Sequence, residues 1–246
     1  MINIVIPMAG AGSRFSKAGF EKPKPFIDVC GKPMIVRVLE NLYYPNARYI
    51  LIARQEHLEK EAALVSSIER SHNASFIAID NITEGTACTV LFARHLIRSS
   101  APVVVANSDQ IIDVDFEKFI DDALSRKLDG SILTFIDPEK SEKWSFAKLD
   151  NKGYVERVEE KKPISEYATA GIYFFKNGEH FIEHSVQMII ENNRSNNEFY
   201  VCPIYNYLIK KNESVGIYNI SAEEMHGIGT PEDLERYISG SSLDLG

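Results

Sequence analysis

The sequence lacks any long hydrophobic run. Its apolar opening, residues 2–6, is too short for the apolar region of a secretion signal, follows no basic region, and leads directly into Pro7 and glycines. Nothing elsewhere resembles the roughly 20 apolar residues that cross a membrane. We therefore expect a cytoplasmic protein with no membrane partner.

Cysteine is scarce. Cys30, Cys88 and Cys202 are far apart, odd in number and show no CxxC spacing, so neither a zinc site nor a redox pair is indicated. This usage is typical of a reduced intracellular chain. We expect the three thiols to be structural.

Basic runs are also missing. The formal net charge is -8, and the lysines and arginines are scattered among acids. No basic stripe is available to neutralise a row of phosphates, which argues against a nucleic-acid partner. A local cluster of cations can still bind a small anion, because the field in a cleft depends on the nearby charges.

What the chain does contain is a repeating pattern of apolar strands and amphipathic helices. A length of 246 residues with 44% hydrophobic content is enough for a continuous core. The alternation predicts an α/β fold, a Rossmann-like and mostly parallel mixed sheet flanked by helices. The predicted strands are 2–6, 49–53, 75–79 and 102–106, and the predicted helices are 33–44, 56–70 and 86–97.

After Asp109 the pattern changes to shorter alternating stretches, which predict a small β extension. Strands are predicted at 131–135, 146–149, 154–158, 168–175 and 215–218, and helices at 116–125, 178–192, 203–209 and from 231 onward. No repeat or flexible linker divides the chain. We expect one domain over 1–246, with a first part over about 1–135 and a second over about 136–246.

The most informative motif follows the first strand. Glycines in the segment from Pro7 to Phe15 allow positive φ and close approach of backbone N–H groups to an anion, at the edge where parallel sheets bind ligands. Neither the Rossmann fingerprint nor the Walker A loop fits this segment. Arg14, Lys22 and Lys24 add three cations, which favours a triphosphate over a plain turn.

An ordered set of motifs runs through nearly the whole chain. The motifs are Gly10-Ala11-Gly12-Ser13-Arg14-Phe15, Pro23-Lys24-Pro25, Gly31-Lys32-Pro33, Gly85-Thr86-Ala87, Asn107-Ser108-Asp109, Glu160-Lys161-Lys162-Pro163, Ala170-Gly171-Ile172-Tyr173 and Gly227-Ile228-Gly229-Thr230-Pro231. This set resembles the sugar-phosphate and phosphocholine-type nucleotidyltransferases. The resemblance implies the GT-A-like nucleotidyltransferase fold, with the β extension on the acceptor side.

The resemblance implies a role for each matching residue. Arg14 and Lys24 are the expected catalytic cations, and Asp109 is the expected ligand of Mg²⁺, the one cofactor. Lys161 would meet the acceptor phosphate, with Lys162 as the alternative register. The expected nucleotide-binding residues are Ala9, Gly10, Ala11, Gly12, Ser13, Gly85, Thr86 and Ala87, and the expected substrate-binding residues are Lys161, Thr169, Gly171 and Glu198.

One departure from the family pattern concerns the metal. The closing segment usually carries a second metal-binding aspartate, and Gly227 stands at that position. Either water completes the shell, or Glu198 or Asp113 substitutes, or activity is lost. Because magnesium keeps several waters and needs few carboxylates, the first option is physically acceptable.

The compact form of the chain, with Trp144-Ser145-Phe146-Ala147, resembles the cytidylyltransferases of capsule biosynthesis. That implies transfer of CMP from CTP to a small phosphorylated acceptor, L-glutamine phosphate, with release of pyrophosphate. The alternative is a sugar-1-phosphate or phosphocholine nucleotidyltransferase using UTP, dTTP or CTP. In either case Trp144 is a candidate wall of the acceptor pocket or a core residue.

Two rival functions use other features. A transferase with an activated sugar donor would use a DxD metal motif, and Asp113-Val114-Asp115 has that spacing, although Asp115 also reads as a helix cap. A nucleotide-binding regulatory protein without turnover would explain Gly227. The sequence leaves the oligomeric state open.

Overall fold

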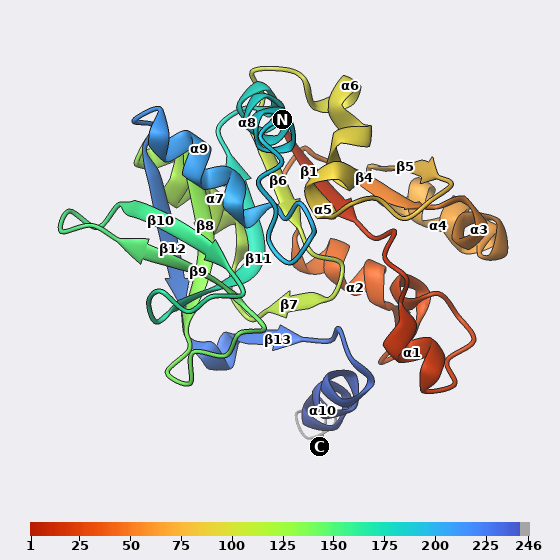
Figure 1. Cartoon of the computed structure of the whole chain (residues 1–246). Coiled ribbons are helices and arrows are strands. Elements are labelled where there is room, and N and C mark those ends of the chain that lie inside the picture. Colours follow the sequence, from red (N-terminus) through yellow and green to blue (C-terminus); the bar gives the residue numbers. More distant parts are fainter. Residues whose placement is uncertain (242–246) are drawn as a thin grey trace.

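A computed structural model describes residues 1–241 of the chain; residues 242–246 of the predicted single domain lie outside the described residues. It has a nine-stranded mixed sheet with helices on both faces and two small two-stranded sheets (Figure 1). The strands are β1 (Ile2–Pro7), β2 (Asp28–Val29), β3 (Lys32–Pro33), β4 (Ala47–Arg54), β5 (Ala74–Ile79), β6 (Val103–Ala106), β7 (Gln110–Ile112), β8 (Gly130–Ile136), β9 (Ser145–Leu149), β10 (Val155–Glu160), β11 (Tyr167–Phe175), β12 (Val215–Ile220) and β13 (Met225–Gly227). The α-helices are α1 (Ser13–Lys17), α2 (Met34–Asn41), α3 (Gln55–Lys60), α4 (Ala62–Ser71), α5 (Thr86–Val90), α6 (Arg94–Ile97), α7 (Phe116–Ser125), α8 (Gly178–Ile190), α9 (Tyr205–Lys210) and α10 (Pro231–Ser241).

The first part of the chain builds the parallel core of the large sheet. β1 pairs in parallel with β4 and β6, and β4 pairs in parallel with β5. All residues of β6 are buried, as expected for a strand covered on both faces. The carboxyl ends of β1 and β6 therefore meet at one edge of the sheet, where the glycine-rich segment and Asp109 follow them.

β11 joins this core to the extension. It runs antiparallel to β8 along one edge, with a shift of register between Thr169 and Tyr173. Along its other edge it pairs antiparallel with β9 at Tyr167 and Ala168, and with β6 from Ile172 to Phe175. β12 then adds in parallel to β8, and β10 adds antiparallel to β9.

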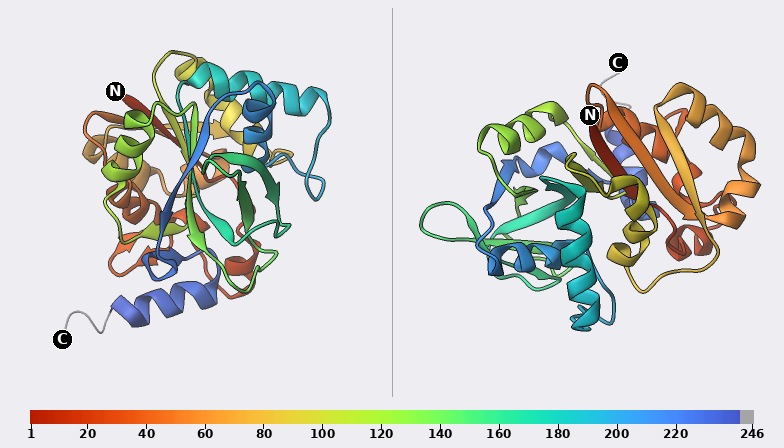
Figure 2. Two further views of the ribbon diagram at one scale, coloured as in Figure 1. Left: turned by 90° about the vertical axis from the view of Figure 1, so that its left-hand side faces the viewer. Right: turned by 90° about the horizontal axis from the view of Figure 1, so that it is seen from above.

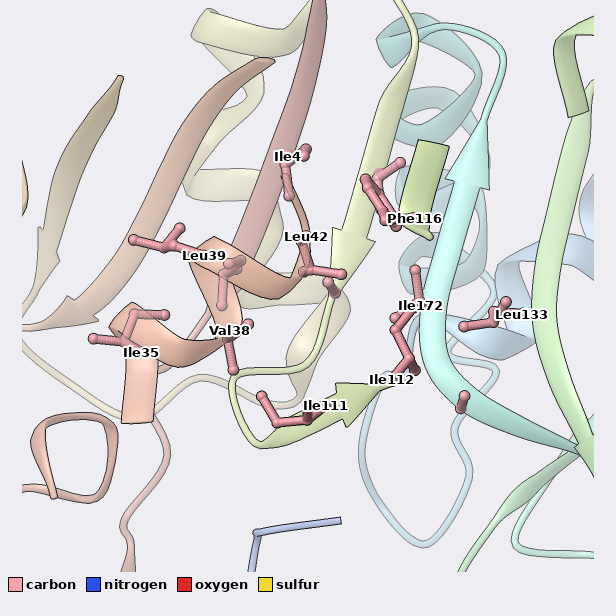
Figure 3. Packing of buried hydrophobic residues seen from close by; sticks show 14 of the residues in the cluster. Ile4, Ile35, Val38, Leu39, Leu42, Ile111, Ile112, Phe116, Leu133 and Ile172 are labelled. Atoms are coloured by element: carbon pink, nitrogen blue, oxygen red, sulfur yellow. The ribbon is translucent and has the colours of Figure 1, made fainter. Parts of the chain in front are cut away.

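The core lies on both faces of the sheet, as the alternation along β1 requires. Ile4 belongs to the hydrophobic cluster that includes residues of α2 and α7, whereas Val5 belongs to the opposite cluster, with residues of α5 and α8. Figure 3 shows Ile4 near Leu42 and Phe116, on the first of these faces.

The predicted α/β fold is confirmed, and two predicted helices are wrong in detail. Helix 56–70 is two helices that meet at Glu61, whose φ of -114° leaves the helical range. Helix 86–97 is α5, a 3₁₀ turn over Leu91–Ala93, and α6. In both cases the helical spacing of apolar residues continues across the interruption, and no Gly or Pro marks the interruption in the sequence.

The antiparallel β7–β13 ribbon was not predicted. Gly227 pairs with Gln110 there, and the Ile228 N–H donates to the Asp109 carbonyl over 2.8 Å. Beyond the ribbon lies α10, at the bottom of Figure 1 and of the left view in Figure 2. None of the helices in residues 1–241 combines the length and apolar character needed to span a membrane.

Candidate functional site

The glycine-rich loop after β1 turns sharply into the short helix α1. Gly12 sits at the entry with φ of 60°, the left-handed conformation that glycine adopts without strain. Phe15 anchors the helix in the core, while Arg14 is exposed beside the loop. Positive φ, predicted for the glycines of this loop, is found at Gly12 and not at Gly10.

Two segments far apart in sequence meet in front of this loop. The Lys24 ammonium donates to the Asp109 carboxylate, and both side chains are partly exposed. Gly229 packs so closely that an added Cβ would lie 2.5 Å from Asp109 Oδ2. The Lys24–Asp109 pair is therefore fixed at the point where β1 and β6 end.

A cleft of about 410 Å³ surrounds this pair, and we call it the main cleft. Its walls come from the glycine-rich loop, the segment after α1, α5 and the segment after β6. The lining residues are Pro7, Met8, Gly10, Gly12, Ser13, Arg14, Phe15, Lys24, Pro25, Thr86, Asn107, Ser108, Asp109 and Gly229.

The turn before α5 is clamped by the segment around Phe199. The Phe199 N–H donates to the Glu84 carbonyl over 2.8 Å, and the Ala87 N–H donates to the Phe199 carbonyl over 2.9 Å. Gly85 has φ of 133°, and a Cβ there would lie 2.4 Å from the Phe199 carbonyl oxygen. Only glycine fits this position, so the backbone beside Thr86 has one fixed course.

A second cleft, of about 230 Å³, adjoins the first through Thr86 and Asn107, which line both; we call it the side cleft. β9, β10, β11 and the residues next to them supply most of its walls. Its other lining residues are Gln110, Lys143, Trp144, Ser145, Glu160, Lys161, Thr169, Gly171, Tyr173, Tyr200, Val201 and Cys202.

Gly171 packs closely against two residues that line the clefts, Asn107 and Gln110. It has φ of 72°, its carbonyl accepts the Asn107 N–H over 2.9 Å, and a Cβ there would lie 2.1 Å from the Gln110 side chain and 2.2 Å from that of Asn107. A larger residue would displace Asn107, which lines both clefts, and Gln110, which lines the side cleft.

The charged groups of the side cleft interact with one another. The Lys161 ammonium donates to the Tyr200 hydroxyl over 2.8 Å, which raises the pKa of Lys161 although burial opposes the shift. Burial raises the pKa of Glu160, and the hydrogen bond from Ser145 partly offsets that effect. Burial is the main cause of the raised pKa of Tyr200, and the negative charge of the exposed Glu198 adds to the raised pKa values of Tyr200 and Lys161.

The structure brings most of the predicted site residues to these two clefts. Lys161 lines the side cleft while Lys162 does not, and Trp144 both lines it and packs edge-on against Phe135, with ring centroids 5.2 Å apart. Lining the main cleft are Gly10, Gly12, Ser13, Arg14, Lys24, Thr86 and Asp109, and lining the side cleft are Thr86, Lys161, Thr169 and Gly171. Ala9, Ala11, Gly85, Ala87 and Glu198 line neither.

The residues of the DxD spacing have other partners. Asp115 caps α7 by accepting the Glu117 N–H over 3.0 Å, and Asp113 lies 2.6 Å from His226 Nε2. Both aspartates are exposed and outside the main cleft. Sequence reasoning did not identify Gln110 or the pairing of Ser145 with Glu160, because each depends on contacts between separate segments.

The donor set of the main cleft fits a magnesium ion only in part. Asp109 is the one carboxylate among its lining residues, and Asn107 and Ser108 add neutral oxygens. Within residues 1–241, no group of three or more His, Cys, Asp or Glu side chains could hold a metal ion. Magnesium is commonly bound through one or two carboxylates together with substrate phosphates, so these residues suit an ion that shares its shell with a bound phosphate.

Comparisons with known proteins agree with this geometry. A family model described as nucleotidyl transferase matches residues 4–234. The catalytic subunit beta of mannose-1-phosphate guanylyltransferase from Drosophila melanogaster is 28% identical over 179 residues, covering 70% of this chain and 47% of that protein. The bifunctional protein GlmU from Methanococcus aeolicus is 26% identical over 178 residues, covering 72% of this chain and 40% of that protein.

Among solved structures, a nucleoside-diphosphate-sugar pyrophosphorylase from Vibrio cholerae has a TM-score of 0.83 and 25% identity, covering 96% of this chain and 99% of its own. The chain spans about half the length of the curated relatives it matches. The likeness extends across the large sheet and the β extension together.

Proposed function

This chain belongs to the nucleotidyl transferase family, and we propose that it transfers the nucleoside monophosphate of an NTP to a small phosphorylated acceptor, releasing pyrophosphate. The observation that carries the proposal is the Lys24–Asp109 pair in the main cleft, which adjoins the side cleft through Thr86 and Asn107. The main cleft would hold the NTP and the side cleft the acceptor. Residues 1–135 and 136–246 would thus be the nucleotide and acceptor parts of one domain.

The chemistry asks the protein mainly to bring two anions together and to neutralise charge. Gly10, Gly12 and Ser13 would cradle the triphosphate, with Thr86 beside the base. Lys24 would approach the α-phosphate, and Arg14 would stabilise the charge that develops on the departing pyrophosphate.

A divalent ion bound with the triphosphate would add Lewis-acid polarisation of the phosphate oxygens, and Asp109 is the residue that would hold it. Lys161 would bind the acceptor from the side cleft and leave its phosphate oxygen in line with the α-phosphorus.

For the acceptor we favour a sugar 1-phosphate. The support is that the matched relatives include a mannose-1-phosphate guanylyltransferase and a nucleoside-diphosphate-sugar pyrophosphorylase. The second candidate is CTP with L-glutamine phosphate in capsule modification. Glu198 favours it, because this exposed carboxylate next to Tyr200 suits an ammonium group on the acceptor. We place the reaction in the cytoplasm, where NTPs are made.

Pyrophosphate release from the purified protein tests the proposal. CTP, UTP, dTTP, ATP and GTP are each combined with sugar 1-phosphates, L-glutamine phosphate or phosphocholine, with and without Mg²⁺. We expect release that requires both an acceptor and Mg²⁺. Binding of an NTP with no release for any pair would favour the regulatory function instead.

Asp109→Asn is the matched variant for this assay. It removes the carboxylate charge while keeping the shape, and we expect kcat to fall by about 100-fold or more, the loss of several kcal/mol of charge stabilisation. Asp115→Asn is the control, since asparagine caps a helix as well as aspartate. Equal activities for the two variants would contradict the role of Asp109.

A further inference from the structure

A third cleft, of about 380 Å³, lies behind the glycine-rich loop, and the functions proposed above do not use it. We call it the back cleft. It shares Gly12 and Lys24 with the main cleft, so the two clefts are neighbours. Its other lining residues are Ala11, Ser16, Phe20, Glu21, Lys22, Pro23, Arg54, Glu56, His57 and Lys60.

The back cleft is basic, in a protein whose net charge is -8. Lys22, Lys24, Arg54 and Lys60 face only two carboxylates among the lining residues. The cations come from the segment after α1, from the end of β4 and from α3, and Figure 1 shows α1 and α3 on the same side of the molecule. A local excess of positive charge inside a concavity attracts anions whatever the overall charge.

Two of these cations are already oriented by the fold. The Lys60 ammonium donates to the Glu21 carbonyl over 2.6 Å, which links α3 to the segment after α1. Arg54 forms an ion pair with Glu56, and its Nη2 lies 2.6 Å from His57 Nε2. A guanidinium or ammonium that is fixed before binding loses less conformational entropy when an anion arrives.

Two residues that line the back cleft, Arg54 and His57, also carry buried polar atoms. Arg54 Nε and His57 Nδ1 are buried and have no hydrogen-bond partner among the described residues. Because Nε2 of His57 accepts from Arg54, the ring proton lies on Nδ1, so both buried groups are N–H donors. Both groups are shielded from water, and the positive charge of Arg54 is partly offset by its ion pair with Glu56.

We propose that the back cleft binds inorganic pyrophosphate after it leaves the main cleft. The choice of ligand rests on the proposed function, in which pyrophosphate is the product, and on the continuity of the two clefts through Gly12 and Lys24. Pyrophosphate carries several negative charges, so as a ligand it matches a cluster of lysines and an arginine better than a molecule with a single carboxylate would. Lys60 and Arg54 are its principal binding residues.

Isothermal titration of pyrophosphate into the full chain, without acceptor, tests the proposal. The variants are Lys60→Ala and Arg54→Gln, and the control is Lys118→Ala, an exposed lysine on α7 that lines none of the three clefts. We expect each variant to weaken pyrophosphate binding about tenfold, the usual effect of losing a hydrogen bond from a charged donor. The affinities for CTP and GTP should change by less than about twofold.

Three results would overturn the proposal: no pyrophosphate binding by the unaltered protein, unchanged binding in a Lys60→Ala variant with normal thermal stability, or equal losses of pyrophosphate and NTP affinity. The last would mean that pyrophosphate binds only in the main cleft. Because the titration needs no turnover, its failure is distinguishable from a failure of nucleotidyl transfer.

Discussion

Gly227, at the end of β13, stands where the family pattern carries a second metal-binding aspartate. Its strand partner is Gln110, directly after Asp109, and a Cβ at Gly227 meets no atom within 4 Å. Gly227→Asp should therefore fit without strain and supply a second carboxylate. We expect Mn²⁺, a probe for Mg²⁺, to bind on the order of tenfold more tightly, the effect of about 1.4 kcal/mol.

Electron paramagnetic resonance of free Mn²⁺ measures this affinity directly. Gly240→Asp is the control, because it adds the same charge on exposed α10, where a Cβ also meets no atom within 4 Å. Equal affinities for the two variants would mean that position 227 does not reach the ion.

Glu160 connects the side cleft to the pH dependence of stability. Burial raises its folded-state pKa, so the folded protein binds a proton more readily than the unfolded chain. The free energy of unfolding therefore falls as the pH rises from the ordinary carboxyl range through the raised pKa. Glu160→Gln, which stays neutral, should lose this part of the pH dependence.

Thermal unfolding across that pH range measures the effect. Stability relative to the unaltered protein should increase with pH for Glu160→Gln and stay constant for Glu142→Gln, an exposed position. Parallel curves for the Glu160 variant and the unaltered protein would show that burial does not govern this carboxyl.

At the scale of single residues, motifs could predict that Arg14, Lys24, Asp109 and Lys161 lie in the clefts. The partners of these side chains could not be predicted. Lys24 and Asp109 are 85 positions apart, and only the folded sheet brings them together. The Tyr200 hydroxyl that binds Lys161 comes from a loop that looks merely polar in the sequence.

Among the elements, β11 contains a closely packed glycine, Gly171. Gly171→Ala would force a left-handed φ on a residue with a side chain and place a methyl group against Asn107 and Gln110. We expect the free energy of unfolding to fall by about 2–4 kcal/mol, the sum of a strain term and an overpacking term. Urea denaturation measures this loss.

Gly153→Ala separates the two terms. Gly153 has φ of 83°, but a Cβ there meets no atom within 4 Å, so only the strain of about 1 kcal/mol should remain. Equal losses for the two variants would contradict close packing at Gly171.

Element prediction succeeded where the apolar spacing was long and regular, as for α7, whose predicted bounds are those observed. It failed where local backbone geometry interrupts a helix, as at Glu61, or where a strand is very short. β7 and β13 have three residues each and pair across more than a hundred positions, which leaves no periodic signal.

On the scale of the whole molecule, the two proposed substrate clefts have nearly separate walls. Lys161→Ala should therefore raise the KM for the acceptor about tenfold or more, through loss of a charged contact, and leave the KM for the NTP nearly unchanged. Initial-rate kinetics with both substrates varied measure the two constants. Lys162→Ala is the control, because this exposed neighbour lines neither cleft; a rise in both KM values for Lys161→Ala would show that the clefts do not act separately.

The α/β architecture could be predicted because each strand and helix carries its own periodic signal. The strand order could not, because it depends on which strands cross over, and β11 pairs with three others at once. The back cleft escaped prediction for the same reason: Lys22, Arg54 and Lys60 converge only after β4 and α3 are in place.

The contact between Lys24 and Asp109 has a consequence for the order in which ligands arrive. The Lys24 ammonium is held beside the Asp109 carboxylate, so it competes with metal ions at a high effective concentration. A divalent ion that arrives without a nucleotide must displace this ammonium. In the proposed function, a triphosphate entering the main cleft would offer Lys24 another anion and would free the Asp109 carboxylate for the metal ion. The metal ion should thus bind to the protein together with the nucleotide and not before it.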